Sequence, residues 1–213
     1  MKNHFYNGIK MHKWIDQLNP KCIVELGCGF FENALLILGY LYKNGTQHHL
    51  IGISDGPPFA ELPPVMGSKF TYLRGITFDV LPHLKTVCPN EMSSGIDILI
   101  VDSDHNYYTV QRELETAAPH LAEKCIIAFH DTNTLEENNL VGHNFLNMSK
   151  VENSTYEFEG YKNGSEYPIE TISKTLDLPI TMAIEEFITS NPEFRIIEKS
   201  TEHCGCWLIG RNV

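Results

Sequence analysis

The amino-acid sequence predicts an α/β fold: a doubly wound, mostly parallel seven-stranded sheet with an antiparallel hairpin at the C-terminal end. Three observations lead to this prediction. Short apolar runs alternate with helical patterns, a glycine-containing turn follows the first run, and two closely spaced strand-like runs stand near the end of the chain. Buried strands that alternate with helices form a parallel sheet covered by helices on both faces.

Five strand-like runs supply the parallel part of the predicted sheet. Each is short, apolar and contains β-branched or aromatic residues, which is typical of a buried strand. They are Lys21–Leu26, His49–Ile53, Phe70–Arg74, Ile96–Val101 and Cys125–Phe129. Two further runs in the tail, Phe194–Lys199 and Cys206–Gly210, are separated by only six residues. Because a crossover helix needs more chain than that, this pair is predicted to be an antiparallel hairpin.

Outside the strand-like runs, apolar residues recur at the spacing of a helix in four segments. Helices are predicted at Met11–Leu18, Asn33–Lys43, Thr109–Leu121 and Ile180–Ile188. In the third of these, Val110, Leu114 and Ala117 recur at the spacing that puts them on one helix face. The second is apolar nearly all round, as expected of a helix packed between a sheet and another layer.

Length and charge limit the classes of protein to which the chain can belong. A chain of 213 residues fits a single domain, and we expect one domain over residues 1–213. Sixteen lysines and arginines stand against 27 aspartates and glutamates, a formal net charge of −11. Such a charge repels a phosphate backbone, and the basic residues are scattered. Nucleic acid is therefore not an expected partner.

The sequence also argues against a membrane protein. Its longest apolar run, Ala34–Tyr42, has nine residues, whereas a spanning helix needs about 20. The first residues contain no apolar core of the kind found in signal peptides, and the six cysteines fall mostly within apolar runs. Reduced thiols and a cytoplasmic location are the resulting expectation.

A long polar segment, residues 133–179, follows the fifth strand and is only weakly periodic. Segments of this length inside a compact domain are typically functional or mobile. Since the segment leaves the sheet directly after His130 and Asp131, we expect it to be a loop or insertion that covers the active site.

The turn after the first strand has the residues of a nucleotide-type cofactor site. It reads Glu25-Leu26-Gly27-Cys28-Gly29 and leads into a helix. Glycines let a backbone approach a ligand closely, and a helix N-terminus offers unpaired N–H groups. A dinucleotide-binding turn has a third glycine three residues later, where this chain has Glu32. The pattern therefore speaks against an NAD-type oxidoreductase.

Polar side chains also follow three other strands of the predicted sheet. Ser54 and Asp55 follow the second strand, where a carboxylate can accept both hydroxyls of a ribose. The fourth and fifth strands lead into the segments Asp102-Ser103-Asp104-His105 and His130-Asp131. Because the ends of neighbouring parallel strands line one crevice, these carboxylates and imidazoles are expected to converge.

These motifs resemble those of the class I S-adenosylmethionine-dependent methyltransferases. The resemblance spans Lys21–Thr132 and is greatest to a branch with a VDxDHxYxxV…HD pattern, which contains cephalosporin-hydroxylase-like and macrocin-type O-methyltransferase sequences. It implies a Rossmann-like fold. It also implies that Glu25 orients the methionine end of the cofactor and that the turn at Gly27 and Gly29 passes beneath it.

The same resemblance implies where the cofactor's ribose is held. The family usually has an acid where this chain has Ser54, and Asp55 comes one residue later. Either the strand end bulges and Asp55 reaches the ribose, or Ser54 takes the role.

The resemblance further implies a candidate site for a divalent metal ion. Members that hold magnesium use the first aspartate of VDxD and an acid pair after the fifth strand, which here are Asp102, His130 and Asp131. His130 stands where another acid is common. Since Mg²⁺ prefers oxygen ligands, this change either weakens the case for magnesium or favours a softer ion. In the alternative, Asp102 contacts the cofactor directly and His130 caps or orients the substrate.

The expected reaction is methyl transfer from S-adenosylmethionine to an oxygen of a small molecule, and the resemblance implies a sugar or natural product as acceptor. The protein must align the acceptor and remove its proton. His105, with an unperturbed pKa near 6.5, and Asp104 are the candidate bases. The alternatives are an enzyme with another nucleotide cofactor, such as NAD, and a non-catalytic cofactor-binding protein. The sequence is compatible with an oligomer.

Overall fold

The computed structural model describes residues 6, 8–28, 32–44, 48–54, 69–132, 154–158, 161–165, 175, 178–201 and 205–213. For 154–158 and 161–165 it describes the backbone alone. Most of the predicted loop 133–179, together with Gly29 and Asp55, lies outside the described residues.

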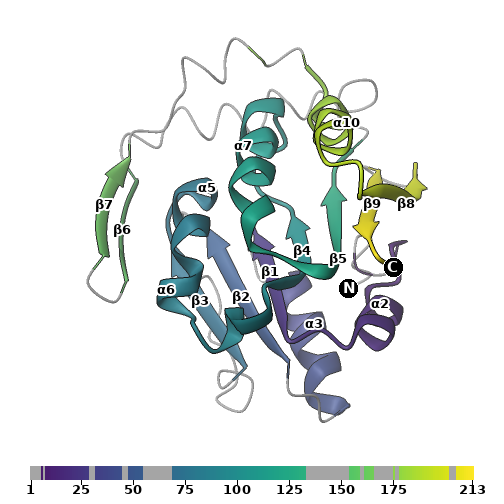
Figure 1. Ribbon diagram of the computed structural model, residues 1–213. Coiled ribbons are helices and arrows are strands. Elements are labelled where there is room, and N and C mark those ends of the chain that lie inside the picture. Colours follow the sequence, from purple (N-terminus) through teal and green to yellow (C-terminus); the bar gives the residue numbers. More distant parts are fainter. Residues whose placement is uncertain are drawn as a thin grey trace.

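A seven-stranded sheet forms the centre of the molecule, with strand order β3-β2-β1-β4-β5-β9-β8 (Figure 1). Its strands are β1 (Cys22–Leu26), β2 (His49–Ser54), β3 (Phe70–Arg74), β4 (Ile96–Val101), β5 (Leu121–His130), β8 (Arg195–Ser200) and β9 (Cys206–Arg211). β1 to β5 pair in parallel, while β9 runs antiparallel to both β5 and β8. The predicted fold class, including the antiparallel C-terminal hairpin, is confirmed.

β5 begins four residues earlier than the apolar run predicts, at Leu121 instead of Cys125. Glu123 and Lys124 interrupt the apolar pattern because their side chains are exposed. The start of the strand is held from the neighbouring strand instead: the Arg211 guanidinium donates hydrogen bonds to the main-chain oxygens of Leu121 and Ala122. A side chain from the far end of the sequence therefore fixes this boundary.

Helices cover both faces of the sheet (Figure 1). Those packed on one face are α2 (Met11–Leu18) and α3 (Glu32–Lys43). Those on the other are α5 (Thr77–Val80), α6 (Leu84–Val87), α7 (Tyr107–Ala117) and α10 (Ile180–Ser190), with short 3₁₀ turns at Leu81–His83, Glu91–Ser94 and Ala118–His120. Within the predicted loop, β6 (Ser154–Phe158) and β7 (Tyr161–Ser165) form a separate antiparallel pair. None of the helices in the described parts is long and apolar enough to span a bilayer.

The central strands are buried on both sides, which is why they read as continuous apolar runs in the sequence. In β4, Leu99 and Val101 pack toward α7 and α10, while Ile98 and Ile100 pack toward α2 and α3. Each such side chain contributes about 1.5–3 kcal/mol when it leaves water. The two apolar layers hold the strands rigidly and therefore fix the positions of the residues that follow them.

The register of the parallel strands brings three strand ends into one row. Leu26 of β1 pairs with Val101 of β4, which pairs with Phe129 of β5. Gly27, Asp102 and His130 come next along their strands. They therefore lie next to one another at the carboxyl edge of the sheet.

Gly27 occupies a position in this row that other residues fill poorly. Its φ is 82°, in the left-handed region, and a Cβ at this position would overlap the main-chain oxygen of Asp102 and the Cα of Ser103. The glycine is thus required by the close approach of two backbones, whatever binds above it.

We predict that Gly27→Ala destabilises the protein by more than about 2 kcal/mol, because a left-handed φ alone costs an alanine about 1–2 kcal/mol and the overlap adds to it. The matched control is Gly39→Ala within α3, where a Cβ would meet nothing within 4 Å. That variant should gain about 0.5–1 kcal/mol, because alanine favours a helix interior. Urea unfolding measures both; equal midpoints for the two variants would contradict the account of Gly27.

Candidate active site

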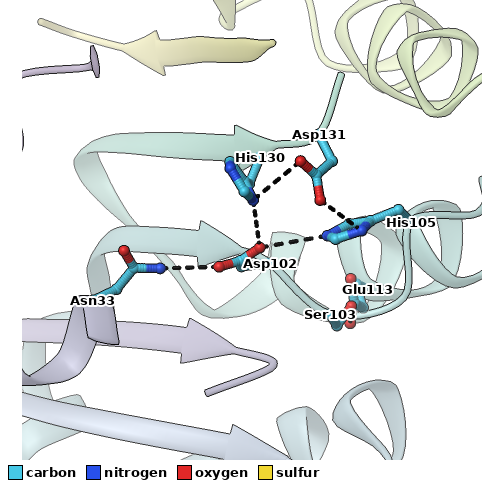
Figure 2. A network of polar contacts seen from close by, with 7 residues as sticks. All are labelled: Asn33, Asp102, Ser103, His105, Glu113, His130 and Asp131. Carbon is cyan, nitrogen blue, oxygen red and sulfur yellow. Dashed lines mark hydrogen bonds and ion pairs between the residues drawn. The ribbon is translucent and has the colours of Figure 1, made fainter. Parts of the chain in front are cut away.

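Four side chains with ionisable groups meet at the carboxyl edge of the sheet, as the sequence predicts (Figure 2). Asp102 follows β4, His130 ends β5 and Asp131 follows it, while His105 comes from the turn between β4 and α7. One nitrogen or oxygen of each lies within 4.8 Å of the others. The four side chains are 10–24% exposed, so a ligand can reach them. We call them the Asp–His cluster.

The contacts inside the Asp–His cluster pair each imidazole with both carboxylates. His130 Nδ1 lies 2.8 Å from Asp102 Oδ1 and 3.4 Å from Asp131 Oδ1. His105 uses both nitrogens: Nδ1 lies 2.8 Å from Asp131 Oδ2, and Nε2 lies 3.4 Å from Asp102 Oδ1. Asp131 has a φ of 55°, a left-handed backbone that aspartate tolerates better than most residues.

The second oxygen of Asp102 is held from the opposite side. Asn33, at the start of α3, donates a hydrogen bond from Nδ2 to Asp102 Oδ2 at 2.9 Å (Figure 2). Glu25 of β1 is 1% exposed, and its Oε2 has no hydrogen-bond partner among the described residues. Asp102 thus has one oxygen facing Asn33 at the start of α3 and the other facing the two histidines.

The charges of the cluster shift the pKa values of its members. Burial would raise the pKa of Asp102, but hydrogen bonds from His105 and His130 outweigh it and lower that pKa to about 2. Burial would lower the pKa of His105, but its bonds to Asp102 and Asp131 raise it to about 10. Burial would lower the pKa of His130, but its contact with Asp102 raises it. Burial would raise the pKa of Asp131, but its hydrogen bond with His105 lowers it. Within this arrangement His105 is an imidazolium at neutral pH, unlike the free histidine considered from the sequence.

The pKa of Glu25 shifts in the opposite direction to those of Asp102 and Asp131, because no cation in the described part of the chain pairs with it. Burial and the charge of Asp102 raise the pKa of Glu25 to about 8. At neutral pH Glu25 is therefore mostly protonated. It can still accept a hydrogen bond, and it adds less than a full negative charge beside Asp102.

The other predicted site residues lie around the Asp–His cluster or outside the described residues. Ser54 ends β2, the strand on the far side of β1 from β4. Asp104 lies in the turn that carries His105 but is not one of the four converging groups. Gly29 and Asp55 lie outside the described residues, and the question of whether Ser54 or Asp55 faces a ribose stays open.

A buried carboxyl that the sequence analysis did not single out supports the turn that carries His105. Glu113 of α7 is 0% exposed, and its Oε1 accepts hydrogen bonds from Ser103, at 2.5 Å, and from Thr77 at the start of α5. Burial raises its pKa to about 8. Glu113 thereby joins the loops that follow β3 and β4. The sequence offers one sign of Glu113: it is a charged residue directly before Leu114, close to the apolar face of α7.

Asn33 is a second site residue that the sequence pattern did not predict, although the sequence contains a sign of it. It is a polar residue near the beginning of an otherwise apolar helix, and it is 6% exposed. A buried amide needs partners, which here are the carboxylates at the strand ends. Only the packing of α3 against β1 and β4 shows which ones.

The fold and the Asp–His cluster define a class of protein: an α/β domain with a polar ligand site where its parallel strands end. A family model described as a methyltransferase domain matches residues 24–132, more than half of the 213 residues. The chain belongs to this methyltransferase family. A comparison with curated proteins finds no match.

Solved methyltransferases have the same fold. The O-methyltransferase TomG from Streptomyces achromogenes, involved in tomaymycin synthesis and solved with SAM, is 13% identical, with a TM-score of 0.57 over 97% of this chain and 80% of TomG. An O-methyltransferase from Bacillus cereus, solved with SAH, is 12% identical, with a TM-score of 0.57 over 97% of this chain and 80% of its own. The methyltransferase MycE from the mycinamycin biosynthetic pathway, solved with Mg, SAH and mycinamycin VI, is 15% identical, with a TM-score of 0.54 over 100% of this chain and 51% of MycE.

We predict that His105 stays protonated through neutral pH in the chelator-treated protein and titrates near pH 10. Because its pKa is higher folded than the ordinary value of 6.5, the stability it contributes is complete below about pH 6.5 and is lost as pH rises toward 10. Proton–nitrogen NMR of the imidazoles measures the midpoint, and Asp102→Asn should lower it.

His120 is the internal control for this titration, because burial lowers its pKa below the ordinary value. A His105 midpoint near 6.5, with His120 behaving as expected, would show that the carboxylates do not hold the proton on His105.

Proposed function

We propose that this chain transfers the methyl group of S-adenosylmethionine to an oxygen atom of a small molecule. The observation that carries the proposal is the Asp–His cluster, which lies at the strand ends directly beside the turn after β1. In a methyltransferase family member, this edge provides a proton-accepting site next to the place for a methyl donor. The O-methyltransferase neighbours support oxygen as the methylated atom.

The residues around Glu25 fit the proposed cofactor. The unpartnered Oε2 of Glu25 is an acceptor at the strand edge, and S-adenosylmethionine carries an ammonium group that such an acceptor can bind. We propose that Glu25, Gly27, Gly29 and Asp102 border the cofactor and that Ser54 or Asp55 binds its ribose. When bound, the cofactor supplies an activated methyl group, so the chain's own task is to orient the acceptor and remove its proton.

We propose that His105, oriented by Asp131, removes this proton. The contact of His105 Nδ1 with Asp131 at 2.8 Å is the shorter one, whereas Nε2 lies 3.4 Å from Asp102. Before the reaction the His105 imidazolium must release its Nε2 proton to solvent, which its 13% exposed side chain can contact. The neutral imidazole keeps its Nδ1 proton, which it donates as a hydrogen bond to Asp131, and it accepts the hydroxyl proton of the acceptor at Nε2. Asp104, in the same turn, is the alternative base.

Magnesium does not fit the Asp–His cluster well, although it is the ion that the family resemblance suggests. Mg²⁺ takes oxygen ligands in a near-ideal octahedron, and two of the four converging groups here are imidazoles. No step of the proposed reaction therefore depends on this ion.

The remaining parts of the proposal concern the acceptor and the surroundings. We propose a sugar or natural product as acceptor, a class supported by the structure of MycE with mycinamycin VI. Residues 133–179 are proposed to cover it within a single domain, which would exclude water from the reaction. We further propose a cytoplasmic enzyme that acts on small molecules and not on nucleic acids or membranes; assembly into an oligomer is compatible with this.

The proposal is tested by calorimetric binding of S-adenosylhomocysteine and by transfer of labelled methyl from S-adenosylmethionine to a panel of hydroxylated sugars and natural products. We expect His105→Gln to lower kcat by about 10²–10⁴-fold, the usual contribution of a general base. Cofactor affinity should change less than about threefold, because His105 acts on the acceptor. Asp104→Asn tests the alternative base: if Asp104 removes the proton, turnover falls in this variant and not in His105→Gln.

His120→Gln is the matched control, because His120 lies before the start of β5, at the opposite edge of the sheet from His130. Its turnover should equal that of the wild type. Near-normal turnover of both His105→Gln and Asp104→Asn would contradict the assignment of the base. Tight binding of NAD without affinity for S-adenosylhomocysteine would contradict the function itself.

A further inference from the structure

Donor atoms of Asp102, His130 and Asp131 lie within 4.8 Å of one another, close enough to surround one metal ion. His130 Nδ1 lies 2.8 Å from Asp102 Oδ1 and 3.4 Å from Asp131 Oδ1. Nitrogen and oxygen ligands at about 2.1 Å from a transition-metal ion are about 3.0 Å apart in an octahedron and about 3.4 Å apart in a tetrahedron. The separation of 3.4 Å falls in this range and the hydrogen-bonded one of 2.8 Å is slightly shorter, so an ion that replaces the hydrogen bond needs little rearrangement of these side chains.

The surrounding contacts leave one oxygen of each carboxylate facing His130. Asp102 Oδ2 accepts from Asn33, which leaves Oδ1 for a ligand position. Asp131 Oδ2 is held by His105, and the buried Asp131 Oδ1 accepts no hydrogen bond from the described residues and contacts the His130 imidazole at 3.4 Å. A buried carboxylate oxygen without a hydrogen-bond donor is rare, and a cation is one of its usual partners. Partners that fix metal ligands in this way typically contribute 10–100-fold to affinity.

His130 decides which class of ion these donors suit. It ends a buried ten-residue strand, so the backbone fixes where its imidazole stands. Imidazole is a good ligand for zinc, copper, iron and nickel, whereas magnesium binds carboxylates, carbonyls and water. One nitrogen and two carboxylate oxygens form a donor set of the kind that binds transition metals in enzymes.

We propose that Asp102, His130 and Asp131 bind a divalent transition-metal ion and that His130 makes this site prefer such an ion over Mg²⁺. Any part that the ion plays in turnover rests on the proposed methyltransferase function, but its binding does not. His105 is a positioning residue for the ion, because it holds the second oxygen of Asp131.

The experiment titrates the chelator-treated full-length protein with Co²⁺ and follows visible d–d absorption, with Mg²⁺ added in large excess as competitor. We expect one Co²⁺ per chain, which Mg²⁺ does not displace. In His130→Glu a carboxylate replaces the nitrogen ligand. Affinity for Co²⁺ should then fall at least about tenfold, and Mg²⁺ should become an effective competitor.

His120→Glu is the matched control and should bind Co²⁺ as the wild type does. Asp131→Asn is a second variant, expected to weaken Co²⁺ binding by at least about tenfold, and circular dichroism confirms that each variant is folded. Wild-type protein that does not bind Co²⁺, or that loses it to Mg²⁺, would overturn the inference, as would equal Co²⁺ affinity in the wild type and His130→Glu. Calorimetry with S-adenosylhomocysteine on the same samples tests the proposed function separately.

Discussion

The organisation of the candidate active site depends on one carboxylate that is held by both of its oxygens. Asp102 receives a hydrogen bond from Asn33 on one side and lies 2.8 Å from His130 on the other. The parallel pairing of β1, β4 and β5 makes this possible, because it places the residues after these strands next to one another. The turn after β1, where we propose the cofactor binds, and the proposed acceptor site are therefore connected through a single side chain.

The electrostatics of this edge follow from the same arrangement. Three acidic residues lie near this edge of the sheet: Asp102, Asp131 and the buried Glu25. Their carboxylates would repel one another if all three were ionised without partners. The two histidines offset the charge of Asp102 and Asp131, because their contacts with these carboxylates raise the pKa of both imidazoles. Glu25 has no such partner, and burial raises its pKa to about 8. Glu113, also buried, is stabilised by the hydroxyls of Ser103 and Thr77 instead.

Much of this structure could be predicted from the sequence because its strands are buried on both faces and read as apolar runs. The convergence of Asp102, His105, His130 and Asp131 could be predicted too, because it needs only the rule that parallel strands end at one edge. Asn33 and Glu113 could not, since a single polar residue on an apolar helix face has no periodic signal and its partners depend on packing. The shifted pKa of His105 likewise depends on distances that only the register and the turn determine.

The central claim is that Asp102 couples the start of α3 to the histidines, and a double-mutant cycle between Asn33 and His130 tests it most directly. These residues contact opposite oxygens of Asp102. The measurement is the free energy of unfolding of Asn33→Ala, His130→Ala and the double variant in urea. The account predicts a coupling energy of about 0.5–3 kcal/mol, as found for residues that share a partner. Additive effects, within about 0.3–0.5 kcal/mol, would contradict it.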